Sequence, residues 1–132
     1  MKIKIKPADS IFSNEIRGRD EWTCQRCGGQ HTPPTQGLHC SHYWGRGNKK
    51  TRFDPRNCIA LCYPCHQLWG HGDERDDYKK HMKELLGKTE FKDLEKCARM
   101  NISFGDSEFK EMAKFLRANG LNGLQEYVST LK

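Results

Sequence analysis

The stretch that decides the fold reads CQRCGG at 24–29, LHCSH at 38–42, RFDPRN at 52–57 and LCYPCH at 61–66. Its two Cys-x2-Cys pairs stand 34 residues apart. Each pair supplies two sulfurs from one tight turn, and four thiolates suit a tetrahedral Zn²⁺ ion. A redox pair would instead begin a helix in a βαβ unit, which this sequence lacks. We therefore predict a structural zinc site, closed to water, whose ligands are Cys24, Cys27, Cys62 and Cys65.

The composition is that of a small folded protein. Of its 132 residues, 35% are hydrophobic and 30% are charged, and no apolar run approaches the roughly 20 residues that span a bilayer. An odd number of cysteines, seven, fits metal-bound and free thiols in a reducing compartment. Three of them, Cys40, Cys58 and Cys97, are predicted to be buried free thiols. We expect a cytoplasmic protein with a core at 1–72, a helical extension at 73–132 and no membrane contact.

The positive charge is concentrated in the part of the chain that holds this stretch. Residues 1–70 carry 11 Lys and Arg against 5 Asp and Glu, whereas residues 71–132 carry 12 of each. A localised basic surface implies a polyanionic partner, of which nucleic acid is the commonest. No helix with base-reading side chains is apparent, so contacts mainly to the DNA backbone are expected. The cations predicted to make them are Arg46, Lys49, Lys50, Arg52 and Arg56.

Hydrophobic periodicity and turn residues predict the order of the elements. Residues 1–6 alternate Lys with Ile, as in a short strand or a basic tail. The further elements expected are a helix from Asp9 or Ser10 to Arg17, a strand at 38–44, extended chain at 51–53 that completes a wide hairpin, a short helix from about Pro64, and helices at 73–86 (ended by Gly87), 89–98, 106–119 and 124–131. This order predicts an α+β fold.

Together, the segments L-H-C-S-H, R-F-D-P-R-N and L-C-x2-C-H resemble the His-Asn-His (HNH) endonucleases. The resemblance is strongest to small phage and prophage members that carry a four-cysteine zinc site. It covers less than half of the chain and implies a ββα-metal core, with an N-terminal helix and several C-terminal helices outside it. It also implies a phage or prophage origin.

The resemblance assigns roles to individual residues. His42 matches the general base, Asn57 the middle Asn that binds backbone or orients the base, and His66 the last His, which binds catalytic Mg²⁺ or Mn²⁺. The family usually places a metal-binding Asp or His immediately before the base, and here that position is Ser41, a poor ligand. Some phage relatives carry an acid three residues before the base, where this chain has His39. His71 is a further candidate ligand.

These observations predict a divalent-metal-dependent DNA endonuclease that hydrolyses phosphodiester bonds. A single HNH site cuts one strand per encounter, so nicking by a monomer is compatible with the prediction. Two alternatives stay open from the sequence. One is a non-catalytic zinc module that binds DNA, with Ser41 marking a decayed metal site. The other is an adaptor in phage packaging or recombination that works through its C-terminal helices.

Overall fold

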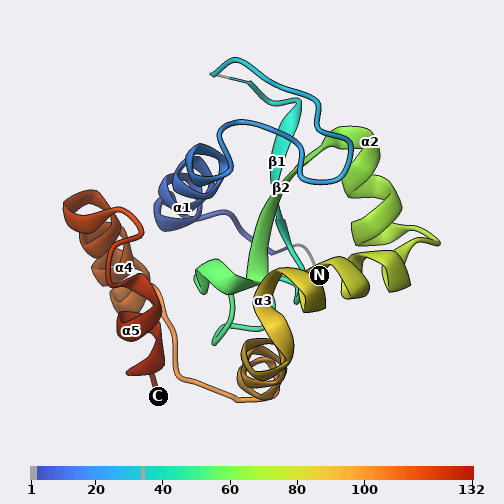
Figure 1. The fold of residues 1–132 in the computed structure, drawn as a ribbon. Helices are drawn as coiled ribbons and strands as arrows, with labels where there is room; N and C mark the ends of the chain where they lie inside the picture. The colour runs from blue at the N-terminus through green and yellow to red at the C-terminus, as the bar shows by residue number, and fades with distance from the viewer. Residues whose placement is uncertain (1–2, 34) are drawn as a thin grey trace.

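A two-stranded sheet lies at the centre of the molecule in a computed structural model, which describes residues 3–33 and 35–132. The strands β1 (Leu38–His42) and β2 (Cys58–Cys62) pair antiparallel. Helices on one side are α1 (Pro7–Arg19), α4 (Asp106–Asn119) and α5 (Leu124–Ser129); on the other are α2 (Tyr63–His66), a π-helical turn at Gln67–His71 and α3 (Arg75–Ala98) (Figure 1). The prediction of an α+β fold is confirmed.

Helix α1 begins at Pro7, earlier than predicted, because proline fits the first position of a helix. The Asp9 carboxylate accepts a hydrogen bond from the Lys6 backbone N–H at 2.8 Å and caps the first turn. Ala8, Phe12 and Ile16, each four residues apart, are buried, and they present one apolar stripe to the helices that follow.

The two strands join through a long loop rather than a simple hairpin. His42 pairs with Cys58 and ends β1, two residues before the predicted end, and the second strand is Cys58–Cys62. The prediction of extended chain at 51–53 is wrong, because this segment turns inward and Thr51 and Phe53 are buried. A short 3-10 helix, Pro55–Asn57, then leads into β2.

At the N-terminus, residues 3–6 form no strand. The basic-tail alternative describes them better than the predicted strand does. Residues 1 and 2, which belong to the same prediction, lie outside the described residues.

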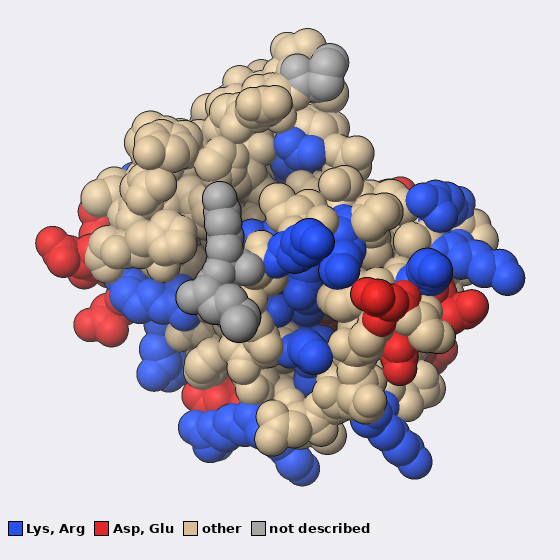
Figure 2. All heavy atoms as spheres, turned by 180° about the vertical axis from the view of Figure 1, so that it is seen from behind, with Lys and Arg blue, Asp and Glu red and all other residues tan. Residues whose placement is uncertain are grey.

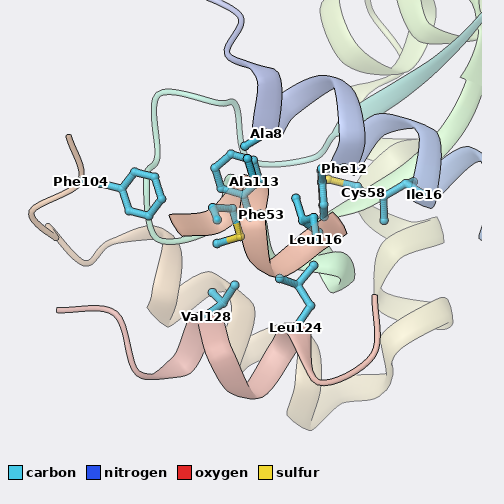
Figure 3. Packing of buried hydrophobic residues seen from close by; sticks show 11 residues of the cluster. Ala8, Phe12, Ile16, Phe53, Cys58, Phe104, Ala113, Leu116, Leu124 and Val128 are labelled. Atoms are coloured by element: carbon cyan, nitrogen blue, oxygen red, sulfur yellow. The ribbon is translucent and has the colours of Figure 1, made fainter. Parts of the chain in front are cut away.

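Two hydrophobic clusters hold the fold together. The first joins Phe12 and Ile16 of α1 to Phe53 of the loop and to Leu116 and Leu124 of the C-terminal helices (Figure 3). The second joins the turns of both Cys-x2-Cys pairs and β2 to both halves of α3. Both clusters contain residues from either side of position 72, so the helices of 73–132 pack against the part of the chain at 1–72.

Helix α3 is interrupted at Gly87, as its sequence predicts. Gly87 has a φ of 82°, a left-handed conformation that suits glycine. The predicted helices at 73–86 and 89–98 therefore correspond to the two halves of α3, on either side of this break.

Candidate active site

The four cysteines of the Cys-x2-Cys pairs converge. Their sulfurs all lie within 4.8 Å of one another, and the Cys27 and Cys62 sulfurs are 3.8 Å apart. Tetrahedral zinc with Zn–S bonds of about 2.3 Å separates its sulfurs by about 3.8 Å, so this set fits such an ion. Burial opposes ionisation of Cys24, but backbone N–H donors, among them that of Cys27, outweigh it and lower the pKa of this thiol to about 7.

A cleft of about 550 Å³ is lined by residues of α1, β1, α2 and the turn after α2. The residues of the predicted catalytic set that line it are His39, His42, His66 and His71, together with Arg46. His39 and His42 come from β1, His66 ends α2, and His71 ends the π-helical turn. The structure thus brings together four histidines that the sequence separates by up to 32 residues.

His39 and His66 form the tightest pair in the cleft, with their Nδ1 atoms 2.9 Å apart. The Nε2 atom of His39 lies 3.1 Å from the Gln36 carbonyl oxygen. A carbonyl can only accept, so His39 Nε2 carries the proton and its Nδ1 lone pair faces His66. Adjacent ligands of an octahedral ion with bonds of about 2.1 Å lie about 3.0 Å apart. This pair could therefore hold a divalent cation.

The imidazole of His66 has a lowered pKa and is therefore neutral near pH 7, as a metal ligand must be. Burial, followed by the neighbouring imidazoles of His39 and His71, lowers the pKa of His66 to about 4. The exposed His71 packs its ring 5.2 Å from that of His66. Among the described residues, the donor atoms of His39, His66 and His71 do not all lie within 4.8 Å of one another, so His71 stands further from the His39–His66 pair.

His42 stands at the end of β1 with its imidazole fixed. Its Nε2 atom donates to the Arg52 carbonyl oxygen at 2.9 Å, which leaves the Nδ1 lone pair free. Burial lowers the pKa of His42 to about 4, and the Arg46 charge adds to this effect, against the hydrogen bond to Arg52. The imidazole is therefore neutral, and able to accept a proton, throughout the neutral pH range.

The side chains of Asn57 and Ser41, near His42, form hydrogen bonds within the fold. The buried Asn57 side chain donates to the Trp44 carbonyl and accepts from the Trp44 N–H, each at 2.8 Å. It thus braces the chain that leaves His42. Ser41 is fully buried with its hydroxyl 2.9 Å from that of Tyr78, so His39 and not Ser41 reaches the cleft.

The structure contradicts the predicted phosphate contacts of three cations. Lys50 is buried and its ammonium donates to the Val128 carbonyl at the end of α5. Arg52 is buried in an ion pair with Asp9. These groups have no surface to offer a phosphate.

Arg56 is also held within the fold. Its guanidinium forms ion pairs with Asp54, Glu90 and Asp93, and its side chain is 10% exposed. The exposed Lys49 donates to the Phe104 carbonyl at 3.1 Å. Arg46 alone of the five predicted cations lines the cleft and has no hydrogen bond to any described residue. Figure 2 shows Lys and Arg side chains gathered in the middle of the face behind the view of Figure 1.

Two features beside the site were not predicted from the sequence. Gly70 lies against His66, where an added Cβ would come within 2.9 Å of the ring carbon Cδ2. The π-helical turn that holds Gly70 is an irregularity that often marks functional sites. The second feature is the thiol pair of Cys40 and Cys58, which lies beside His42. Strand alternation from His42 to Cys40 was the available signal.

The HNH endonuclease family model (HNH_2) matches residues 19–73. Over this segment, called the HNH segment, the chain is similar to the HNH endonuclease family. The HNH segment contains both Cys-x2-Cys pairs, both strands, α2 and all four histidines of the cleft. No curated protein and no solved structure matches the chain. The predicted resemblance is confirmed, and a match to a family of endonucleases supports nuclease chemistry in general terms.

Proposed function

We propose that the protein is a divalent-metal-dependent DNA endonuclease that hydrolyses phosphodiester bonds, with His42 as its general base. The observation that carries the proposal is the cleft of the HNH segment, in which His42 faces the same space as the His39–His66 pair and Arg46. A zinc ion on Cys24, Cys27, Cys62 and Cys65 is proposed to be structural, because four protein ligands leave it no open position.

The proposed mechanism uses each cleft residue for one task. His42 Nδ1 takes a proton from water as the water oxygen bonds to phosphorus, and the bond from phosphorus to the 3′ oxygen breaks. The proton finally reaches the leaving oxygen, which gives 5′-phosphate and 3′-hydroxyl ends. Asn57 is a positioning residue, because it fixes the backbone beside His42.

His39 and His66 are the proposed ligands of the catalytic Mg²⁺ or Mn²⁺. Such a cation supplies charge stabilisation for the phosphoryl oxygens and the leaving alkoxide. Gln36 supports this role by fixing the tautomer of His39, as backbone carbonyls commonly do for metal-binding imidazoles. Arg46 is the cation of the cleft that is free to contact phosphate, and His71 at its rim is a further proposed ligand or phosphate contact.

The decisive experiment is a supercoiled-plasmid assay with Mg²⁺, Mn²⁺ or EDTA, in which His42→Ala and His66→Ala are compared with wild type. We expect metal-dependent open circles and a loss of about 10²–10⁴-fold in rate for His42→Ala. His31→Ala, outside the cleft, is the matched control and should cut normally. Open circles that outlast linear product would support nicking by a monomer.

The same assay separates the alternatives. Plasmid that stays intact with every metal but is retarded on a gel, in EDTA as well, would replace the nuclease by a DNA-binding module. Plasmid that is neither cut nor bound would favour an adaptor that works through its C-terminal helices. Equal cutting by wild type and both variants would show that the site is misplaced.

A cytoplasmic location and a phage or prophage origin belong to the same proposal. All seven cysteines are unpaired thiols, as expected in a reducing compartment. No described helix is long and apolar enough to cross a membrane.

A further inference from the structure

A second thiol cluster lies next to the proposed general base. The sulfurs of Cys40 and Cys58 and one ring nitrogen of His42 all lie within 4.8 Å of one another. The register of the sheet explains this, since Cys58 pairs with His42 and Cys40 stands two residues before it on the same strand face. No member belongs to the four-cysteine site or to the His39–His66 pair.

The cluster combines a buried wall with an open side. Cys58 is 1% exposed, whereas Cys40 and His42 are partly exposed and line the cleft. A cation that enters the cleft can therefore reach all three donors and retain water or another ligand in its fourth position.

The donor set selects the kind of cation. Two thiolates and an imidazole favour soft or borderline ions such as Zn²⁺ and Cd²⁺, and disfavour Mg²⁺. Tetrahedral zinc with bonds of about 2.3 Å to sulfur and about 2.1 Å to nitrogen needs donors about 3.6–3.8 Å apart. Side-chain shifts of about 1 Å close the present arrangement to that geometry.

We propose that Cys40, His42 and Cys58 form an inhibitory site for Zn²⁺ or a similar soft cation. An ion bound there occupies His42 and withdraws it from proton transfer. The inhibition rests on the proposed nuclease function, whereas binding of the ion does not. The nuclease would then require the structural zinc and be inhibited by a further equivalent of the same metal.

Binding is tested by titrating reduced protein with Cd²⁺ and measuring thiolate-to-metal absorption in the ultraviolet. Six ligand sulfurs are expected in the wild type, four from the first cluster and two from the second. Cys40→Ala should saturate at a signal close to that of the four-sulfur site, and Cys58→Ala provides a second variant if Cys40→Ala folds poorly. Cys97→Ala, a thiol outside both clusters, should match wild type. An identical signal for wild type and Cys40→Ala would overturn the site.

Inhibition is tested by plasmid cleavage at fixed Mg²⁺ and rising free Zn²⁺. Cys40→Ala should raise the half-inhibitory zinc concentration by about tenfold or more, the scale expected when a metal site loses support. Equal inhibition of Cys40→Ala and Cys97→Ala would overturn the inhibitory role. If no preparation cleaves DNA, the proposed function fails, and the Cd²⁺ titration still decides whether the site exists.

Discussion

Replacing Arg52 by Met tests whether this buried arginine stabilises the fold rather than DNA binding. Its Nε and Nη2 atoms donate to the two carboxylate oxygens of Asp9 at 2.9 and 2.6 Å. The two side chains are 6% and 7% exposed. The pair ties the loop between the strands to the first turn of α1.

The expected loss follows from the charge that is left behind. Removing one partner of a buried ion pair costs about 3–5 kcal/mol. After Arg52→Met, Asp9 keeps its hydrogen bond from the Lys6 N–H, so we expect about 3 kcal/mol. At about 1–3 kcal/mol per molar of urea, the unfolding midpoint should fall by about 1–3 M.

The assay is urea unfolding of zinc-loaded protein followed by tryptophan fluorescence, with DNA binding measured below the transition. Combining Arg52→Met with Asp9→Asn, which removes the buried charge, should restore part of the lost stability. Arg52→Lys supplies a milder variant should Arg52→Met not fold. Wild-type stability combined with weakened DNA binding in Arg52→Met would refute this reasoning and restore Arg52 as a phosphate contact.

Three further predictions concern the cleft. The pKa of His42 is lowered to about 4, so its neutral form persists as the pH falls. The cleavage rate at saturating metal should therefore stay nearly constant from pH 7.5 to 5.5. A base with the ordinary pKa of about 6.5 would instead lower the rate about tenfold over this range. Arg46→Ala should reduce the slope of log DNA affinity against log salt concentration by about 0.9, whereas Lys50→Met should leave this slope unchanged. Equal slopes for wild type and Arg46→Ala would show that Arg46 does not contact DNA phosphate. Gly70→Ala places a Cβ 2.9 Å from the His66 ring and should lower the affinity of the cleft for Mn²⁺ by about tenfold. The affinity is measured from the dependence of cleavage on Mn²⁺ concentration, and Gly18→Ala is the neutral control. The same Mn²⁺ dependence in Gly70→Ala and wild type would contradict the role of this contact.

The sequence predicted which cysteines and histidines come together better than it predicted the path of the chain around them. Cysteine spacing and the positions of His42 and His66 are local patterns, and the structure gathers these residues as expected. Thr51–Phe53 has strand-forming residues, but Arg52 turns inward to Asp9, a partner 43 residues away. Tertiary contacts of this kind override local propensity.

The same limit explains the misassigned cations. Lys50 lies in a basic turn, as phosphate-binding lysines often do, and only the fold shows that it caps the end of α5. The partners of Arg56, Glu90 and Asp93, lie 34 and 37 residues further along the sequence. Arg46 differs because no described acidic or carbonyl group takes its guanidinium, a property that no local pattern reveals.

The adjacency of Cys65 and His66 in α2 has a consequence for how the two proposed ions act on each other. One peptide bond joins a ligand of the zinc cluster to a ligand of the catalytic pair, so the position of one depends on that of the other. Thermodynamic linkage makes such coupling reciprocal. Occupancy of the four-cysteine site should raise the affinity of the cleft for its cation, and a filled cleft should raise the affinity of the four-cysteine site for zinc by the same free energy.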